Sequence, residues 1–345
     1  MDTKIVQRIR ENLQRQRESL FEWLGHTPPL KKKIHLGNAD EQAVAQHLQV
    51  LNEALGKAED CTLGLCQVCN DYVETSRIEM DFTACVCIDH YSVEERRKLE
   101  AELELAQKVQ KSLLPQQLPQ IPGMHVAAYS QPAQIVGGDY FDFFRFHNNA
   151  HGFAIADVMG KGMPASLLMA SLQASLRILA PENDSPLAVM QRLNTLFAHN
   201  TQLIKFITIF LGSFDPHTRV LEYCNAGHNP PLLVRKRNEG YSVEWLKPTG
   251  AAIGLVESFN FGIEKVTLEA GDVLLLYTDG LTEAMNAQDE EYGEQRLLAL
   301  LQRAHGSSPQ ALLHDLRHAL RDFTGKVSLH DDFTMIAAKV GEYDN

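Results

Sequence analysis

The apolar residues from Met124 onward fall into short runs that predict β-strands. In GFAIADV, FITIFLGSF and DVLLLYTDG, β-branched and aromatic side chains are frequent, and residues typical of turns bound the runs. Further runs of this kind are HVAAYS, DYFDFFRF, VLEYCNAG, PLLVRK, GIEKVTL and FTMIAAKV. Helical spacing interrupts them over residues 163–179, 186–199, 295–303 and 309–323. Strands with helices in separate blocks predict an α+β layered fold, in which roughly 220 residues suffice for a core.

The first part of the chain is patterned for helices. Apolar residues recur at near-helical spacing over 5–24 and again over 44–55, and the segment GHTPP at 25–29 interrupts the pattern. Two amphipathic helices joined by a loop that contains proline predict an antiparallel hairpin.

A highly charged helix is predicted over 92–114, SVEERRKLEAELELAQKVQKSLL. Its apolar stripe alternates steps of four and three, as in a coiled coil, for about two heptads. The positions of this stripe are Leu99, Leu103, Ala106, Gln110 and Leu113. Two interpretations fit: a dimerising coiled coil, or a helix packed on the adjoining domain. Prolines follow the helix, so we divide the chain into residues 1–91, a linker helix over 92–114, and a large domain over 115–345.

The composition, 44% hydrophobic and 22% charged, is that of an ordinary globular protein. The formal net charge of −12 argues against a binder of nucleic acid or of an anionic membrane, because either requires a basic face. No apolar stretch reaches the ~18 residues of a membrane-spanning helix, and the N-terminus does not resemble a signal peptide. A cytoplasmic location is therefore expected, in which the six cysteines stay reduced.

Five of the six cysteines lie close together in the sequence, which indicates metal or redox chemistry in a reducing compartment. Cys66 and Cys69 form one chelating pair, and after 17 residues Cys87 and His90 form a second. Two such pairs have the spacing of a tetrahedral zinc site. Cys85 makes a competing pair with Cys87 at a spacing that suits zinc less well.

The segment ALGKAEDCTLGLCQVCNDYV, followed by RIEMDFTACVCIDH, resembles the DksA/TraR zinc finger. The resemblance implies one structural Zn²⁺, with His90 standing where that family usually has its fourth cysteine. DksA-like proteins reach into RNA polymerase with a helical hairpin, but here the hairpin is short and no acidic pair is evident at its tip. Three roles stay open for the finger: a folding staple, a sensor of metal or of oxidation through its thiolates, and a docking module.

Four motifs place aspartates at the ends of predicted strands: GGDY with Asp139, ADVMGKG with Asp157, YTDG with Asp279, and HDDF with Asp331 and Asp332. A single aspartate in such a place is most often a turn former or a helix cap. Together, in a chain without a Ser/His/Asp or Cys/His pattern, they indicate a site for hard divalent cations, which prefer oxygen ligands. Two such ions can acidify a shared water and bind a phosphoryl group, so a cluster of aspartates suffices for phosphoryl transfer.

These motifs resemble, in order, the SpoIIE/RsbU-type branch of the metal-dependent protein serine/threonine phosphatases, the PPM fold. The resemblance runs through residues 107–340. It rests on QKSLLPQQLPQIPG, GGDYFDFF, DVMGKGMPASLLMA, FITIFLGSFDP, CNAGHNPPLL, GAAIGL, GDVLLLYTDGLTEAMN and DDFTMIAAKV. It implies a β-sandwich of two antiparallel sheets flanked by helices, with a binuclear Mn²⁺ or Mg²⁺ site at one edge.

The resemblance also implies a role for each ligand. Asp157 is expected to bridge both metals, and the backbone carbonyl of Val158 to complete the coordination of one. Asp279 and Asp331 are expected to hold the second metal. Asp139 is expected to orient metal-bound water.

The neighbours of these ligands leave alternatives open. Whether Asp331 or Asp332 binds the metal is undecided, although related phosphatases often carry Asn where Asp332 stands, which favours Asp331. Lys161 either steers phosphate or is a solvated lysine. His228 is interpreted as a structural residue rather than as the proton donor to the leaving serine.

The chain is thus expected to be a phosphoserine/phosphothreonine protein phosphatase that uses a water bridging two Mn²⁺ or Mg²⁺ ions. The resemblance implies a STAS-domain anti-anti-sigma factor as substrate, in a partner-switching pathway. The zinc domain is the expected regulatory input, and the linker helix the transmitter within a homodimer. The alternative is a zinc-finger regulator that binds RNA polymerase or another protein and carries a silent phosphatase scaffold.

Overall fold

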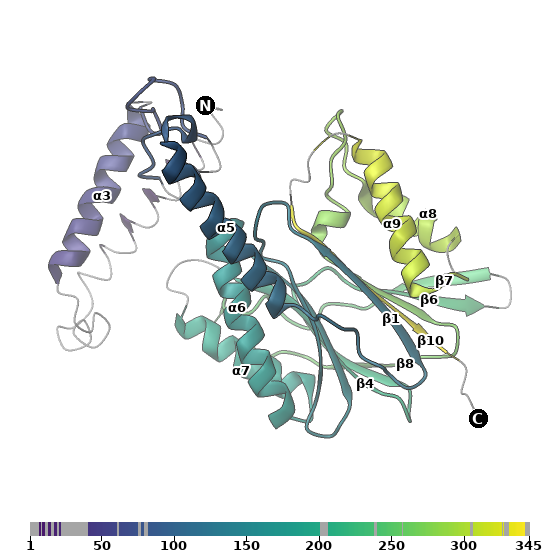
Figure 1. Ribbon diagram of the computed structural model, residues 1–345. Coiled ribbons are helices and arrows are strands. Elements are labelled where there is room, and N and C mark those ends of the chain that lie inside the picture. The colour runs from purple at the N-terminus through teal and green to yellow at the C-terminus, as the bar shows by residue number, and fades with distance from the viewer. Residues whose placement is uncertain are drawn as a thin grey trace. The chain divides into compact units, whose positions relative to one another are not determined.

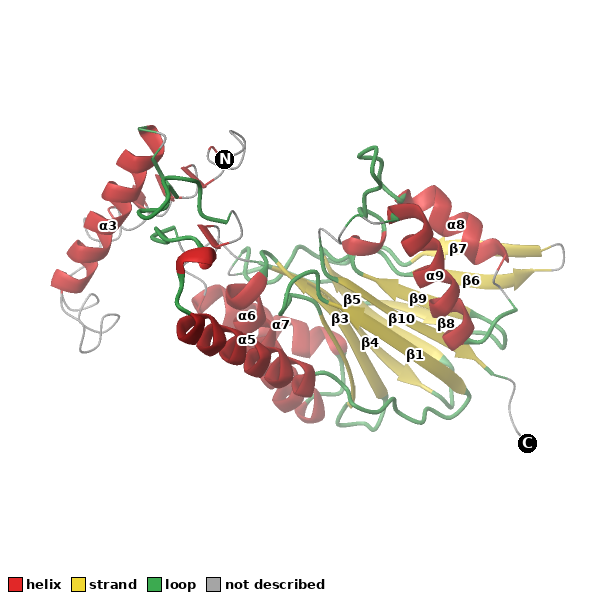
Figure 2. Cartoon of the chain, turned by 45° about the horizontal axis from the view of Figure 1, so that its top comes forward, coloured by secondary structure: helices red, strands yellow, loops and turns green. Residues whose placement is uncertain are grey.

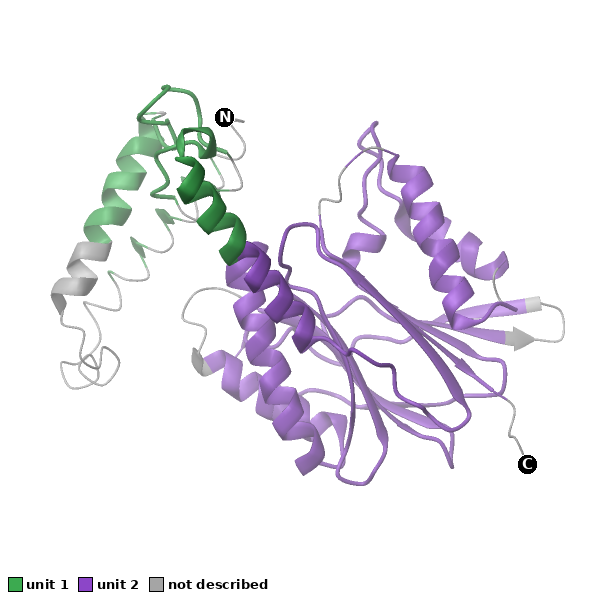
Figure 3. Cartoon of the chain, in the orientation of Figure 1, with its two compact units in different colours: residues 1–102 green, residues 103–345 purple. Residues whose placement is uncertain are grey.

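The computed structural model divides the chain into two compact units, residues 1–102 and 103–345 (Figure 3). The boundary falls within one continuous helix, α5 (Val93–Leu113), where the linker helix was predicted. The residues described are 7, 9–10, 13–14, 17–18, 21, 41–60, 62–74, 77–78, 82–200, 206–237, 240–256, 258–303, 306–325, 327 and 331–341.

The larger unit contains two five-stranded antiparallel sheets, as the resemblance implied (Figure 2). The first sheet has the order β1 (Met124–Gln131), β10 (Phe333–Val340), β9 (Val273–Tyr277), β6 (Leu232–Arg237) and β7 (Gly240–Trp245). The second has the order β2 (Tyr140–Arg145), β3 (His151–Val158), β4 (Ile207–Asp215), β5 (Val220–Ala226) and β8 (Glu264–Thr267).

The two sheets share one hydrophobic core. Alternate residues of each strand point to the same face, so Phe141 and Ile155 of the second sheet meet Leu274 and Ile336 of the first. The opposite faces bury their own apolar residues against helices. The result is a layered helix–sheet–sheet–helix sandwich (Figure 1).

Two helices cover each sheet. Helices α6 (Gly162–Leu179) and α7 (Pro186–Asn200) pack on the second sheet, whereas α8 (Gly293–Arg303) and α9 (Pro309–Thr324) belong to the core of the first. Judged by length and composition alone, the segment Gly162–Glu182 could cross a bilayer. Its residues at helical spacing are buried in the core, and this packing accounts for its apolar composition.

The predicted strands and helices of this unit are found close to their predicted bounds, and one strand was missed. Strand β7 lies at an edge of the first sheet, and its side chains from Tyr241 to Trp245 are half-buried or exposed. A strand without an alternation of buried and exposed positions gives no period-two pattern in the sequence.

The smaller unit contains α3 (Glu41–Glu59), the cysteine-rich segment, a short 3₁₀ helix η1 (Ile88–His90) and the start of α5. Its core joins Leu51 and Leu55 of α3 to Ile9 and Leu13 of the first predicted helix. Only some positions of that helix are described, and the predicted loop at 25–29 lies outside the described residues. The N-terminus of α5 is a capping box, in which Ser92 and Glu95 each bond the other's backbone N–H.

Candidate active site

Aspartates from both sheets lie at one end of the sandwich. Asp139 directly precedes β2 and Asp157 lies near the end of β3, and the antiparallel register places both at the same end of this hairpin. Asp279 follows β9, and Asp331 and Asp332 precede β10, which pairs with β9. The structure therefore assembles the predicted carboxylates from four separate segments of the chain.

A hydroxyl group connects the two sheets at this end. Thr278 Oγ1 donates to Asp139 Oδ2 at 2.7 Å and accepts from the backbone N–H of Thr334 at 3.0 Å. Thr278 and Asp139 are both buried. Thr278 was not predicted as a site residue, because a threonine beside a strand end has no distinguishing pattern.

Both carboxylate oxygens of Asp332 accept hydrogen bonds from the backbone of another loop. Its Oδ1 accepts from the N–H of Ala133 at 2.8 Å, and its Oδ2 accepts from the N–H of Gly138 at 2.6 Å and, at 3.4 Å, from that of Asp139. The side chain is buried, so these bonds replace its hydration. Asp332 thereby holds the loop that carries Asp139 against the start of β10.

The carboxylates raise one another's pKa. Burial first, and then Asp279 and Asp331, raise the pKa of Asp157 to about 7. Burial, Asp157 and Asp332 raise the pKa of Asp139 well above its ordinary value. Burial and Asp331 also raise the pKa of Asp279. The cluster thus concentrates negative charge in a partly desolvated place, which favours a bound cation.

Lys161 contributes a positive charge to this cluster. It occupies the N-cap position of α6, and its Nζ lies 2.9 Å from Asp331 Oδ2. Its side chain is half-exposed, so it is an ion-paired residue at the rim rather than a lysine that contacts only solvent. Lys161 also lowers the pKa of Asp157, as a nearby cation must.

Two adjacent glycines let backbone segments approach closely. A Cβ at Gly137 would lie 2.2 Å from Asp332 Oδ2, and a Cβ at Gly138 would lie 2.7 Å from the carbonyl oxygen of Val158. Such distances are too short for any side chain, so the GGD motif requires glycine at both positions.

The His228 ring lies behind the cluster. Thr208 is the cross-strand partner of Asp157, and its Oγ1 lies 3.0 Å from His228 Nδ1. His228 is buried, and burial lowers its pKa to about 3, so the ring is neutral. A buried neutral imidazole supports the strand beneath Asp157 and is poorly placed to protonate a substrate.

The end of α5 contacts the loop that precedes Asp139. Gln110 Nε2 donates to the carbonyl of Gly137 at 2.6 Å, and Gln110 Oε1 accepts from the N–H of the same residue at 3.0 Å. The heptad pattern predicted Gln110 as part of a coiled-coil stripe and gave no indication of this contact. The stripe positions from Leu103 to Leu113 are half-buried, whereas Leu105 and Val109 are 62% and 52% exposed.

The cysteine-rich segment forms a second cluster in the smaller unit. The predicted ligands have all their ligand atoms within 4.8 Å of one another: Cys66, Cys69, Cys87 and His90. Among the described residues it is the one set of three or more such side chains grouped so tightly. Two backbone N–H groups, of Val68 and Cys87, lie 3.4 and 3.3 Å from Cys66 Sγ. Such N–H···S bonds stabilise a thiolate.

Residues 148–341 match the family model described as Stage II sporulation protein E. Phosphoserine phosphatase RsbU of Bacillus subtilis is 30% identical over 248 residues, which span 71% of this chain and 71% of RsbU. Phosphoserine phosphatase RsbP of the same organism is 27% identical over 186 residues, which span 53% of this chain and 45% of RsbP.

Solved structures share the architecture of the larger unit. The SiaA-PP2C domain of Pseudomonas aeruginosa has a TM-score of 0.63 at 21% identity, over 72% of this chain and 99% of that one. The RsbU and RsbW domains of a Mycobacterium tuberculosis protein have a TM-score of 0.55 at 25% identity, over 66% of this chain and 62% of that one. The two-sheet sandwich is therefore a PP2C-like fold.

Proposed function

The chain belongs to the SpoIIE family and is a protein serine/threonine phosphatase, and from this premise we propose that its aspartate cluster holds two Mn²⁺ or Mg²⁺ ions. One observation carries the proposal: burial and mutual repulsion raise the pKa of Asp139, Asp157 and Asp279. Oxygen ligands at this charge density suit hard divalent cations. Bound there, the ions would acidify a water molecule and neutralise the phosphoryl oxygens.

Some residues of the cluster are assigned as metal ligands, and others keep those ligands and the attacking water in position. We assign Asp157, Asp279 and Asp331, with the carbonyl of Val158, to the ions. Asp331 is preferred over its neighbour, because both oxygens of that neighbour accept backbone N–H groups. Asp139, which accepts from Thr278, would orient the attacking water.

The first test is the metal dependence of p-nitrophenyl phosphate hydrolysis by the full chain. We expect chelated protein to turn over at least about a hundredfold more slowly than protein with saturating Mn²⁺. A parallel series with Mg²⁺ compares the rates that the two ions support. Zn²⁺ added alone is the control for an effect of metal at the cysteine cluster. Turnover that persists after complete removal of divalent ions would contradict the proposal.

We propose a phosphorylated STAS-domain protein as the substrate. The support is the similarity to the phosphoserine phosphatases RsbU and RsbP, together with the family resemblance of the motifs. The metal series can be repeated with such a phosphoprotein in place of the nitrophenyl ester, with released phosphate as the readout.

We further propose that Cys66, Cys69, Cys87 and His90 bind one Zn²⁺ and form a DksA/TraR-like finger that regulates the phosphatase. Arg77 supports this cluster, since it donates to the carbonyl of Val86 at 2.9 Å and to the hydroxyl of Tyr91. Tyr91 directly precedes the capping box of α5, so zinc binding at the cluster would affect the start of that helix.

The zinc content of purified protein tests this assignment. We expect about one zinc per chain, lost in Cys66→Ser because a serine hydroxyl is a poor zinc ligand. The matched control is Cys85→Ser, which changes a half-buried cysteine outside the cluster and should keep the zinc. Equal zinc contents in the two variants would exclude this ligand set.

We propose that helix α5 both transmits the regulatory signal from the zinc domain to the phosphatase and forms the dimer contact. Its Gln110 reaches the backbone of the loop before Asp139, and its exposed Leu105 and Val109 lie one turn apart. We expect the mass in solution to rise with concentration toward a dimer, and Val109→Glu to shift it toward the monomer. A mass that remains that of a monomer at every concentration would contradict the proposed dimer.

A further inference from the structure

Within the described part of the chain, Lys161 is the one cation among the leading electrostatic influences on the aspartate cluster. Burial and neighbouring carboxylates raise the pKa of Asp157, Asp279 and Glu283, and Lys161 lowers the pKa of each. Its Nζ lies 2.9 Å from Asp331 Oδ2. A phosphoryl group would bring further negative charge to this place, and protein cations are common ligands of that charge. Lys161 is therefore the described side chain with the charge that a phosphate at this site requires.

The stability of α6 does not explain why position 161 is a lysine. Lys161 occupies the N-cap position of this helix, where serine, threonine, aspartate or asparagine is preferred because its side chain accepts an N–H of the first turn. A lysine has three donors and no acceptor, and this side chain makes no capping bond. Residues that conflict with a local preference in this way are expected at functional sites.

Glycines fix the backbone on both sides of Lys161. Gly160 has a φ of 105° and Gly162 a φ of 69°, in the left-handed region that residues with a Cβ rarely adopt. Lys161 itself is extended, with φ −132° and ψ 162°. The GKG sequence therefore gives the short loop between β3 and α6 a defined course that places Lys161 beside Asp331.

The pair of Lys161 and Asp331 lies on the solvent side of the cluster. Their side chains are 45% and 39% exposed, whereas Asp139 and Asp332 are buried. A half-exposed ion pair contributes little to the stability of the fold, because water screens the two charges. The ion pair alone therefore does not account for the lysine, and a phosphate that arrives from solvent can reach its ammonium group.

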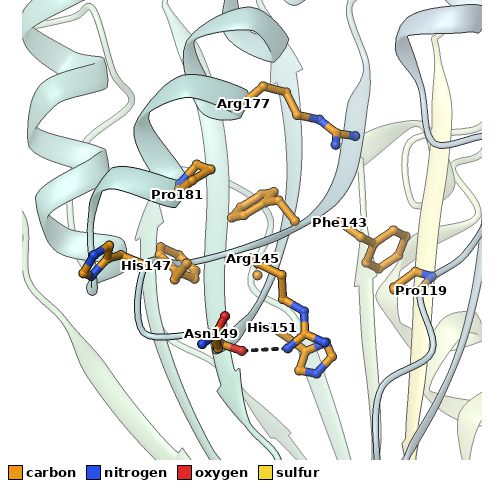
Figure 4. Close-up of a pocket in the computed structure, with 11 residues that line it drawn as sticks. Pro119, Phe143, Arg145, His147, Asn149, His151, Arg177 and Pro181 are labelled. Atoms are coloured by element: carbon orange, nitrogen blue, oxygen red, sulfur yellow. Dashed lines mark hydrogen bonds between the residues drawn. The ribbon is translucent and has the colours of Figure 1, made fainter.

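A second group of cations lies at the opposite end of the β2–β3 hairpin, around a pocket of about 580 Å³ (Figure 4). Arg177 pairs there with Asp142, and Arg145 donates to the carbonyl of Asn149. The extended strand from Tyr140 to Arg145 separates this pocket from the aspartates by about 17 Å. This distance exceeds the length of an arginine side chain, so these cations do not contact a phosphate at the cluster.

Given the metal site proposed above, on which this assignment rests, we propose that Lys161 binds the phosphoryl group of the substrate. An ion on Asp331 would take up part of the charge of that carboxylate and so weaken its attraction for Lys161. The ammonium group would then donate to the phosphoryl oxygens. Three donors on a flexible stem suit a group whose oxygens point in several directions.

Binding of inorganic phosphate to the full chain loaded with Mn²⁺ tests this assignment without requiring turnover. The paramagnetic resonance signal of free Mn²⁺ measures how much of the ion is bound, and the relaxation of the phosphorus nucleus measures phosphate near the bound ion. We expect Lys161→Met to weaken phosphate binding by at least about tenfold, because one charge-assisted contact is lost. The affinity for Mn²⁺ should stay equal or rise, because a positive charge beside Asp331 is removed.

Lys161→Arg is the conservative variant and should keep the phosphate affinity within about threefold of the wild type. Arg145→Met is the matched control, since it removes a positive charge at the far end of the hairpin, and it should change neither affinity. Equal phosphate affinities in the wild type and Lys161→Met would overturn the assignment alone. So would a parallel loss of Mn²⁺ and phosphate in Lys161→Met, because Lys161 would then only support Asp331. A wild type that binds no Mn²⁺ would overturn the metal site as well.

Discussion

Replacing Asp157 by Asn is expected to lower turnover at saturating Mn²⁺ by at least about a thousandfold. Asp157 interacts with the carboxylates of both sheets: Asp279 and Asp331 raise its pKa, and it raises that of Asp139. Asparagine preserves the shape of the side chain but removes the charge that a shared ligand must supply. The measurement is the rate of p-nitrophenyl phosphate hydrolysis across a Mn²⁺ titration.

The same variant should be at least as stable as the wild type when metal is absent. Burial and repulsion raise the pKa of Asp157 from 3.8 to about 7, so its ionised form destabilises the metal-free fold above that pH. The gain from asparagine is therefore largest above pH 7, shrinks as the pH falls and is gone below about pH 4. Thermal melts of chelated protein at several pH values measure it.

The control for both measurements is Asp322→Asn, which changes an exposed aspartate near His318 on α9. It should leave turnover and melting temperature unchanged. An Asp157→Asn protein that keeps its Mn²⁺-dependent rate would show that the ions, if bound, are held elsewhere.

Asp332→Ala should destabilise the protein by about 3 kcal/mol, with or without Mn²⁺, because it leaves buried backbone N–H groups without an acceptor. The groups concerned are those of Ala133 and Gly138, with a weaker contact to Asp139. Denaturant unfolding of chelated protein measures this loss directly.

Asp331→Ala is the matched comparison, because the side chain of Asp331 is partly exposed and its carboxylate pairs with Lys161. It should change stability little in the absence of metal and weaken Mn²⁺ binding by at least about tenfold. The opposite pattern, in which only Asp332→Ala weakens Mn²⁺ binding, would reverse the assignment of the ligand.

The strand pattern and the aspartate motifs could be predicted from the sequence because each has a local signature. A buried strand such as β3 is a continuous apolar run, and the aspartate at its end interrupts that run. The cysteine pairs are likewise defined by spacing alone, and the structure brings the four predicted ligands together.

The supporting contacts have no such signature, because they join residues far apart in the chain. Thr278 bonds Asp139 across 139 positions, and Gln110 bonds Gly137 from a helix whose periodicity indicates a different role. Such contacts depend on tertiary packing, which local patterns do not specify.

The division of the aspartates between two sheets links the proposed ions to the lifetime of the protein. Asp139 and Asp157 belong to one sheet, and Asp279 and Asp331 to the other, so an ion shared by both sets would join the sheets at the end where Thr278 bonds Asp139. Such an ion binds the native state alone and slows local opening. Proteolytic turnover in the cell, which acts on opened states, would then follow the supply of manganese or magnesium.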